Sequence, residues 1–90
     1  IEDFNIAVKN NPVDAYYNRG TVKVKYGDYI GAIQDFDRVI EIQLGFAMAY
    51  YNRGIAKFEL GDKSGAGLDW NKSFDLGMKE AYDLIKTHFN

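Results

Sequence analysis

Few side chains in this sequence could perform covalent chemistry. The 90 residues include no cysteine, a single histidine (His88), and serine only at Ser64 and Ser73. Nucleophilic and acid–base catalysis need a nucleophile beside a base of tuned pKa, and no such pair is indicated by these positions. We expect His88, two residues from the end of the sequence, to be solvent-facing or to lie at a helix end. The sequence therefore predicts a protein without enzymatic activity.

Metal and phosphate sites are not indicated either. A thiolate site needs cysteine, and aspartates such as Asp62, Asp69 and Asp75 are spaced as helix caps and solvated side chains. They lack the dense oxygen-ligand spacing of a calcium loop. The glycines do not form a phosphate-binding loop. We expect no cofactor.

The overall composition limits the partners. Thirteen acidic and eleven basic residues are scattered along the chain and give a net charge of −2, so no positive field is available to attract a nucleic acid. RNA binding by a helical repeat would fit this acidity poorly. The longest apolar runs are a few residues, whereas a membrane-spanning helix needs about 20. We expect a protein or peptide partner, and the composition assigns no cellular compartment.

A repeat of 34 residues organises the chain. The pentapeptide Tyr-Tyr-Asn-Arg-Gly at 16–20 recurs at 50–54, and residues 13–46 match residues 47–80 at 12 of 34 positions. Periods of this length are typical of tandem arrays of a small structural unit.

Each unit reads as a helical hairpin. Helical apolar spacing predicts a first helix over 15–26, and Gly27 stands where a helix stop is expected. Asp28 can cap a second helix, in which apolar residues from Ala32 to Ile40 lie on one face. The second unit repeats this plan with helices over 47–60 and 64–76.

Two shorter segments flank the units. Residues 1–11 have the same residue spacing as the second helix of the first unit, so we expect them to be the second helix of a preceding unit. The residues that carry this spacing are Ile1, Asp3, Phe4, Ala7 and Val8. Because Ile1 falls inside this pattern, we expect the sequence to be a piece of a longer protein. Residues 78–90 predict a capping helix with one solvated face, as terminal units of arrays require. The predicted organisation is thus one domain over 1–90, with repeats at 13–45 and 46–77.

The residues at fixed positions of each unit resemble the tetratricopeptide repeat family over essentially the whole chain. The resemblance implies an all-α fold: a right-handed α-solenoid of antiparallel helical hairpins, with about two full repeats, a leading half repeat and a C-terminal capping helix. The matching residues are Tyr16, Gly20, Gly27, Ala32, Phe36 and Val39 in the first unit and Tyr50, Gly54, Gly61, Ala66 and Trp70 in the second.

The sequence departs from the family pattern at the junctions. Leu44 and Met78 stand where the family usually has proline, so we expect the turn at Leu44–Gly45 to rely on glycine. The interval from Phe4 to Tyr16 is two residues shorter than its equivalent in the next unit. We therefore expect the first helix of unit one to start late or to follow a tighter turn.

The first helix of each unit carries a second apolar stripe, and a second stripe needs a second partner. The resemblance implies that these helices line the concave surface and meet a peptide there, with two asparagines as polar contacts. The predicted peptide-binding face consists of Tyr17, Asn18, Thr21, Val24, Met48, Tyr51, Asn52, Ile55 and Phe58. The alternative, left open, is that Tyr17, Tyr51 and Phe58 merely pack against the neighbouring helix.

In some relatives an asparagine at the positions of Asn18 and Asn52 belongs to a clamp for a peptide's C-terminal carboxylate. Tyr17, Thr21 and Met48 stand where that clamp needs lysine or asparagine, so we do not expect it.

Two interpretations of function follow. The first is a non-enzymatic protein–protein interaction module that binds a peptide or partner segment on its concave face. The alternative is a self-associating, homo-oligomeric or helix-exchanging scaffold, in which another chain covers Ile1, Phe4 and Val8.

Two structural details are also predicted. Arg19 and Asp35 have the same separation as Arg53 and Asp69, which predicts one ion pair in each hairpin. In the second unit Gly67 replaces Ile33, and we expect the larger ring of Trp70 to fill the space that the missing side chain leaves.

Overall fold

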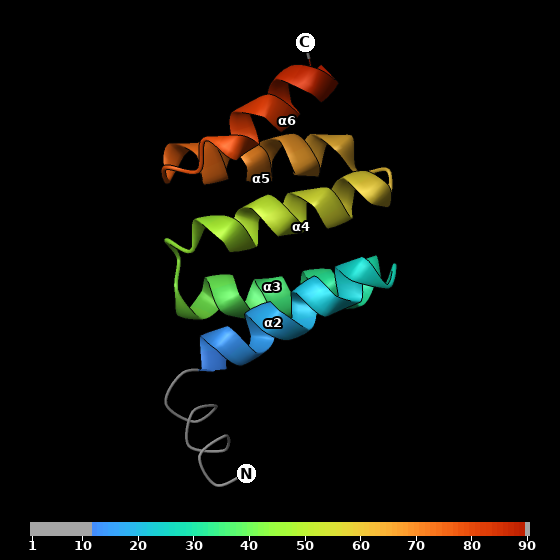
Figure 1. Ribbon diagram of the computed structural model, residues 1–90, viewed down its shortest axis with the longest axis vertical. Helices are drawn as coiled ribbons and strands as arrows, with labels where there is room; N and C mark the ends of the chain where they lie inside the picture. The colour runs from blue at the N-terminus through green and yellow to red at the C-terminus, as the bar shows by residue number, and fades with distance from the viewer. Residues whose placement is uncertain (1–11, 90) are drawn as a thin grey trace, which may run out of the picture.

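A computed structural model describes residues 12–89, which form five helices and no strand, so the all-α prediction is confirmed (Figure 1). The helices stack along the long axis of the molecule in chain order, and each packs against the next. The helix predicted within residues 1–11 lies outside the described part. The five helices are α2 (Pro12–Lys25), α3 (Tyr29–Ile42), α4 (Ala47–Glu59), α5 (Lys63–Asp75) and α6 (Glu80–Phe89).

The two hairpin turns, between α2 and α3 and between α4 and α5, have the same construction. Gly27 (φ 85°) and Gly61 (φ 92°) adopt the left-handed conformation that ends a helix and that other residues reach only with strain. The carboxylates of Asp28 and Asp62 then accept hydrogen bonds from the backbone N–H groups of Gly31 and Gly65 at 3.0 and 2.9 Å. The predicted stops and the predicted Asp28 cap are confirmed.

The beginning of α2 differs from the prediction. We expected the first helix to start late, at Ala15, or to follow a tighter turn; the late start was wrong, because the helix already includes Pro12. Proline is tolerated in the first turn because its missing N–H group would have no partner inside the helix there. Pro12 therefore belongs to the first turn of α2.

The junction between the hairpins also differs from the prediction. Gly45 does not have a positive φ, so the turn does not depend on glycine's special freedom. Instead Gln43 takes an extended conformation with its N–H bonded to the Val39 carbonyl, and the N–H of Phe46 donates to the Gln43 carbonyl at 3.2 Å. Leu44 is exposed.

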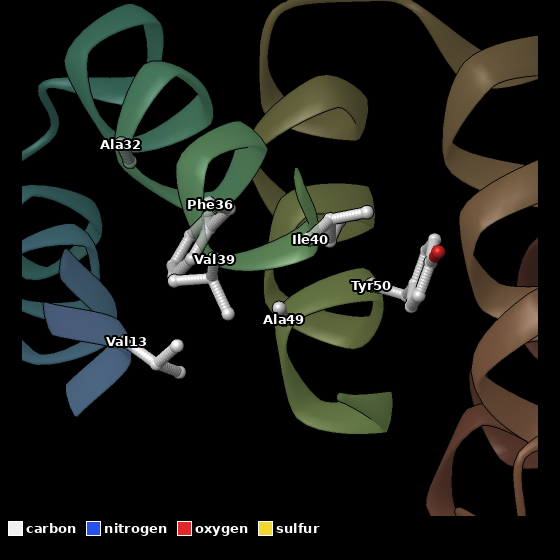
Figure 2. Packing of buried hydrophobic residues seen from close by; sticks show 7 residues of the cluster. All are labelled: Val13, Ala32, Phe36, Val39, Ile40, Ala49 and Tyr50. Atoms are coloured by element: carbon white, nitrogen blue, oxygen red, sulfur yellow. The ribbon is translucent and has the colours of Figure 1, made fainter. Parts of the chain in front are cut away.

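The first part of the core joins three helices. Buried side chains from α2, α3 and α4 gather around Phe36 and Val39, both fully buried (Figure 2). Gly20 makes this packing possible, because a β-carbon at that position would lie 2.7 Å from the Phe36 ring. The cluster is Val13, Ala32, Phe36, Val39, Ile40, Ala49 and Tyr50.

The second part of the core lies where α4, α5 and α6 meet, around Ala66, Trp70 and Ala81. Gly54 permits the close approach of Trp70 in the same way that Gly20 admits Phe36. The space beside Gly67 is occupied by Phe89 of α6, whose ring would lie 3.3 Å from an added β-carbon. The prediction that Trp70 fills this space was wrong, because α6 brings a ring to that position.

Candidate peptide-binding face

In the first unit, the predicted face is built around Tyr17. Its ring is half-buried and lies 5.9 Å from the ring of Phe36 and 5.1 Å from that of Phe46. The side-chain amide of Asn52 donates to the Tyr17 hydroxyl at 2.9 Å and to the Met48 carbonyl at 3.1 Å. Burial raises the pKa of Tyr17, and the hydrogen bond from Asn52 partly offsets this. The hydroxyl thus ties α2 to α4.

In the second unit, α6 covers much of the equivalent surface. Tyr51, Ile55 and Phe58 are half-buried and pack around Trp70 together with residues of α6. The Phe58 ring lies 5.7 Å from the Trp70 ring and 4.4 Å from the His88 ring. His88 is exposed, as expected, and its imidazole contacts the rings of Phe58 and Trp70.

The predicted face therefore divides into two kinds of residue. Tyr17, Val24, Tyr51, Ile55 and Phe58 are partly used in contacts between helices, and for Tyr17, Tyr51 and Phe58 this is the alternative that the sequence left open. Asn18 and Met48 are exposed, and Thr21 and Asn52 are partly accessible. The Thr21 hydroxyl donates to the Asn18 backbone carbonyl at 2.8 Å.

A small hollow adjoins this surface between α4 and α6. Its volume is about 240 Å³, and it is open to solvent at one side. Sequence reasoning did not predict it, because it depends on where α6 packs. Its lining residues are Ile55, Phe58, Glu59, Trp70, Leu84 and His88.

Both predicted ion pairs are confirmed, and each is bidentate. Arg19 donates from Nε and Nη2 to the Asp35 carboxylate at 2.9 and 2.7 Å, and Arg53 holds Asp69 in the same way at 2.9 and 2.8 Å. Asp35 and Asp69 are 2% and 4% exposed. Paired arginines of this geometry hold the two helices of a hairpin in register.

A lysine completes each pair, with Lys23 Nζ 3.2 Å from Asp35 and Lys57 Nζ 3.2 Å from Asp69. Burial alone would raise the pKa of Asp35. The hydrogen bonds and positive charges of Arg19 and Lys23 outweigh that effect and hold the pKa below its ordinary value near 3.8. These charges stabilise the fold and are already occupied by internal partners.

Arg53 makes one further contact that the sequence did not predict. Its Nη1 donates to Asp37 of α3 at 2.8 Å, so a single guanidinium joins α3, α4 and α5. The bond to Asp69 raises the pKa of Arg53, against the effect of its own burial. The guanidinium is thus a permanent charge that connects the two units.

Two other kinds of feature are absent from the described part of the chain. Within residues 12–89, no three histidine or acidic side chains lie close enough together to hold a metal ion. No helix in that range is long and apolar enough to cross a membrane. The residues of the predicted self-association surface, Ile1, Phe4 and Val8, lie outside the described part.

Comparison with known proteins adds no identification: no family model matches the sequence, and no curated protein is similar to it. The residues of the face offer apolar side chains, amides and hydroxyl groups.

Proposed function

We propose that this chain is a non-enzymatic protein–protein interaction module: a right-handed, tetratricopeptide-like solenoid whose concave face binds a peptide. One observation carries the proposal. The hydrogen bond between Asn52 and Tyr17 links the first helices of the two units directly. Equivalent side chains of α2 and α4 therefore contribute to a single surface, which is what an extended ligand needs.

The accessible residues suggest how a peptide would be held. Met48 is 47% exposed and offers a flexible apolar contact that adapts to different side chains. The amide of Asn18 and the side-chain oxygen of Asn52 are the groups that would hydrogen-bond a peptide backbone, because the N–H groups of Asn52 already donate to Tyr17 and Met48. The half-buried rings of Tyr17 and Tyr51 form the wall behind them. Because those rings are held by other helices, little side-chain freedom is lost on binding.

The ligand that fits this surface is an extended segment with apolar side chains. The two arginines of the hairpins are engaged with buried carboxylates, so the face offers no free guanidinium for an acidic motif. Affinity would come from apolar contact at Met48 and Tyr51, with the asparagines setting the orientation of the chain.

A peptide-display experiment tests the proposal. The whole chain is used to select peptides from a random library, and binding is measured for Met48→Glu. The control is Leu68→Glu, which adds the same charge at a position on α5 that is 72% exposed. We expect selected peptides to lose at least about tenfold in affinity for Met48→Glu and to keep it for Leu68→Glu. Equal binding to both variants, or no selected peptide, would refute the peptide-binding face.

A further inference from the structure

The hollow between α4 and α6 combines aromatic rings with a carboxylate. The ring centroids of Phe58 and His88 lie 4.4 Å apart, and each lies 5.7 Å from that of Trp70. Glu59 is the one acidic residue of the lining, and within residues 12–89 no lysine or arginine belongs to it. The face of an aromatic ring carries partial negative charge, so the rings and the carboxylate favour the same kind of group, a cation.

The side chain of Glu59 is exposed and is not used by the fold. The ion pairs of α4 use Arg53 and Lys57, and none within residues 12–89 includes Glu59. One cation of the protein, the ammonium of Lys63, lies 5.9 Å from the centroid of the Phe58 ring but does not line the hollow. The carboxylate of Glu59 is therefore open to a charged group of a ligand.

The two hairpins show which cation suits this combination of groups. The guanidinium carbon of Arg53 lies 5.5 Å from the centroid of the Tyr50 ring while the same side chain holds Asp69. The first hairpin has the same arrangement, with its arginine 5.7 Å from a tyrosine ring. The hollow offers rings and a carboxylate without the arginine. A guanidinium stacks on rings and is more weakly hydrated than an ammonium, which favours arginine over lysine as the group that binds here.

The hollow lies on the same side of α4 as the accessible part of the peptide-binding face. Residues at i, i+4, i+7 and i+11 share this side, and they are Met48, Asn52, Ile55 and Glu59. At 1.5 Å per residue, Met48 and Glu59 are about 16 Å apart along the helix, which an extended peptide covers with about five residues. The hollow lies at the α6 end of the stack, whereas α2, where the described chain begins, lies at the other end (Figure 1).

We propose that the hollow binds an arginine side chain of the peptide ligand, with the guanidinium against the rings of Phe58 and His88 and paired with the Glu59 carboxylate. The aliphatic stem of the arginine contacts Ile55 and Leu84, which also line the hollow. This arginine site rests on the proposed peptide-binding function and adds a second anchor to it. The ligand class becomes a basic peptide, in which an apolar residue and an arginine are about five positions apart.

Two short peptides provide the probe, one for each direction in which a chain can cross the two anchors. Both are blocked at their ends and carry leucine and arginine separated by four alanines, in opposite orders. Each is titrated into the whole 90-residue chain, and binding is followed by the fluorescence of Trp70, the only tryptophan, which lines the hollow. We expect at least one peptide to bind with a dissociation constant of about 0.1–10 mM. Citrulline in place of arginine keeps the shape but removes the charge, and should weaken binding about tenfold.

Variants of the protein locate the bound arginine. Glu59→Gln should weaken binding of the arginine peptide about fivefold and leave binding of the citrulline peptide unchanged. The control is Glu41→Gln, an equal change of charge at a side chain of α3 that is 68% exposed, and it should bind both peptides as the parent chain does. The arginine site would be overturned by no saturable fluorescence change with either peptide, by equal affinity for arginine and citrulline, or by an arginine preference that Glu59→Gln leaves intact.

Met48→Ala separates this result from a test of the peptide-binding face. If the arginine preference depends on Glu59 but Met48→Ala does not weaken binding, the arginine site is supported and the wider face is refuted. If Met48→Ala weakens binding but arginine and citrulline peptides bind equally, the face is supported and the arginine site is refuted.

Discussion

Substitution of Gly54 by alanine should destabilise the protein, although alanine is the better helix former. A β-carbon at Gly54 would lie 2.5 Å from Nε1 and 2.6 Å from Cδ1 of Trp70, and 3.2 Å from the backbone oxygen of Ala66. Trp70 has no room to retreat, because it is 1% exposed and its indole N–H donates to the Tyr51 carbonyl at 3.1 Å.

The magnitude follows from three contributions. Overpacking of a close-packed core costs about 1–3 kcal/mol. Displacing the indole from its hydrogen bond leaves a buried donor unpaired and costs about 1–3 kcal/mol more. Replacing glycine by alanine inside a helix returns about 1 kcal/mol. We therefore expect Gly54→Ala to lower the free energy of unfolding by about 1–5 kcal/mol, which is a large part of the stability of a domain of this size.

The matched control is Gly67→Ala, in the neighbouring helix. An added β-carbon there meets only the tip of Phe89, at 3.3 Å, and that ring is 43% exposed on the last described helix. Since Phe89 has room to move by a few tenths of an ångström, the helix-propensity gain dominates, and we expect Gly67→Ala to stabilise by up to about 1 kcal/mol.

Both variants are compared with the parent chain by urea denaturation followed by circular dichroism. The reasoning would be refuted if Gly54→Ala were as stable as the parent chain, or if the two substitutions changed stability equally. Either result would mean that propensity, rather than the close approach of Trp70, governs these positions.

Three further predictions concern the polar contacts. Arg53→Met should lower the free energy of unfolding by about 2–4 kcal/mol in urea titrations, because it leaves the buried carboxylate of Asp69 without its arginine and removes the bond to α3. Arg19→Met, at a more exposed position, should lower it clearly less. Equal losses for the two variants would contradict the bridging role of Arg53. Because folding lowers the pKa of Asp35, the unfolded chain binds a proton at Asp35 more readily, and the free energy of unfolding should fall as the pH drops below about 4. In a series of denaturation curves at different pH, Asp35→Asn should make the free energy of unfolding depend less steeply on pH. An unchanged pH dependence would contradict this role of Asp35. Tyr17→Phe removes the acceptor of the Asn52 amide and should cost about 1 kcal/mol in thermal unfolding, whereas no cost would show that the link between α2 and α4 contributes nothing to stability.

Much of the local structure could be predicted from the sequence. Gly27 and Gly61 end helices because the required backbone conformation is one that other residues reach only with strain, and Asp28 caps the following helix through a bond to a residue three positions later. The ion pair between Arg53 and Asp69 could also be predicted, because a hairpin with a short turn leaves few ways to align its two helices. In each case the residues that interact lie close in sequence or are connected by one short turn.

The candidate face was predicted less completely. Helical spacing indicated that Tyr17, Tyr51 and Phe58 share a stripe, but spacing does not indicate whether a stripe meets solvent or another helix. The structure shows that Phe46, Asn52 and α6 occupy part of that stripe. The start of α2 was misjudged for a similar reason, since proline is compatible both with the end of one segment and with the first turn of the next.

The repeating unit, the positions of the turns and the charged pairs within each hairpin follow from local sequence, because they depend on contacts between residues that one helix or one short turn brings together. How the units meet follows from the packing of the folded chain. This packing places Asp37 against Arg53, Phe89 over Gly67 and α6 against Phe58. Such contacts depend on the angle and distance at which whole helices pack, which are set by the shapes of many side chains at once and not by any local pattern.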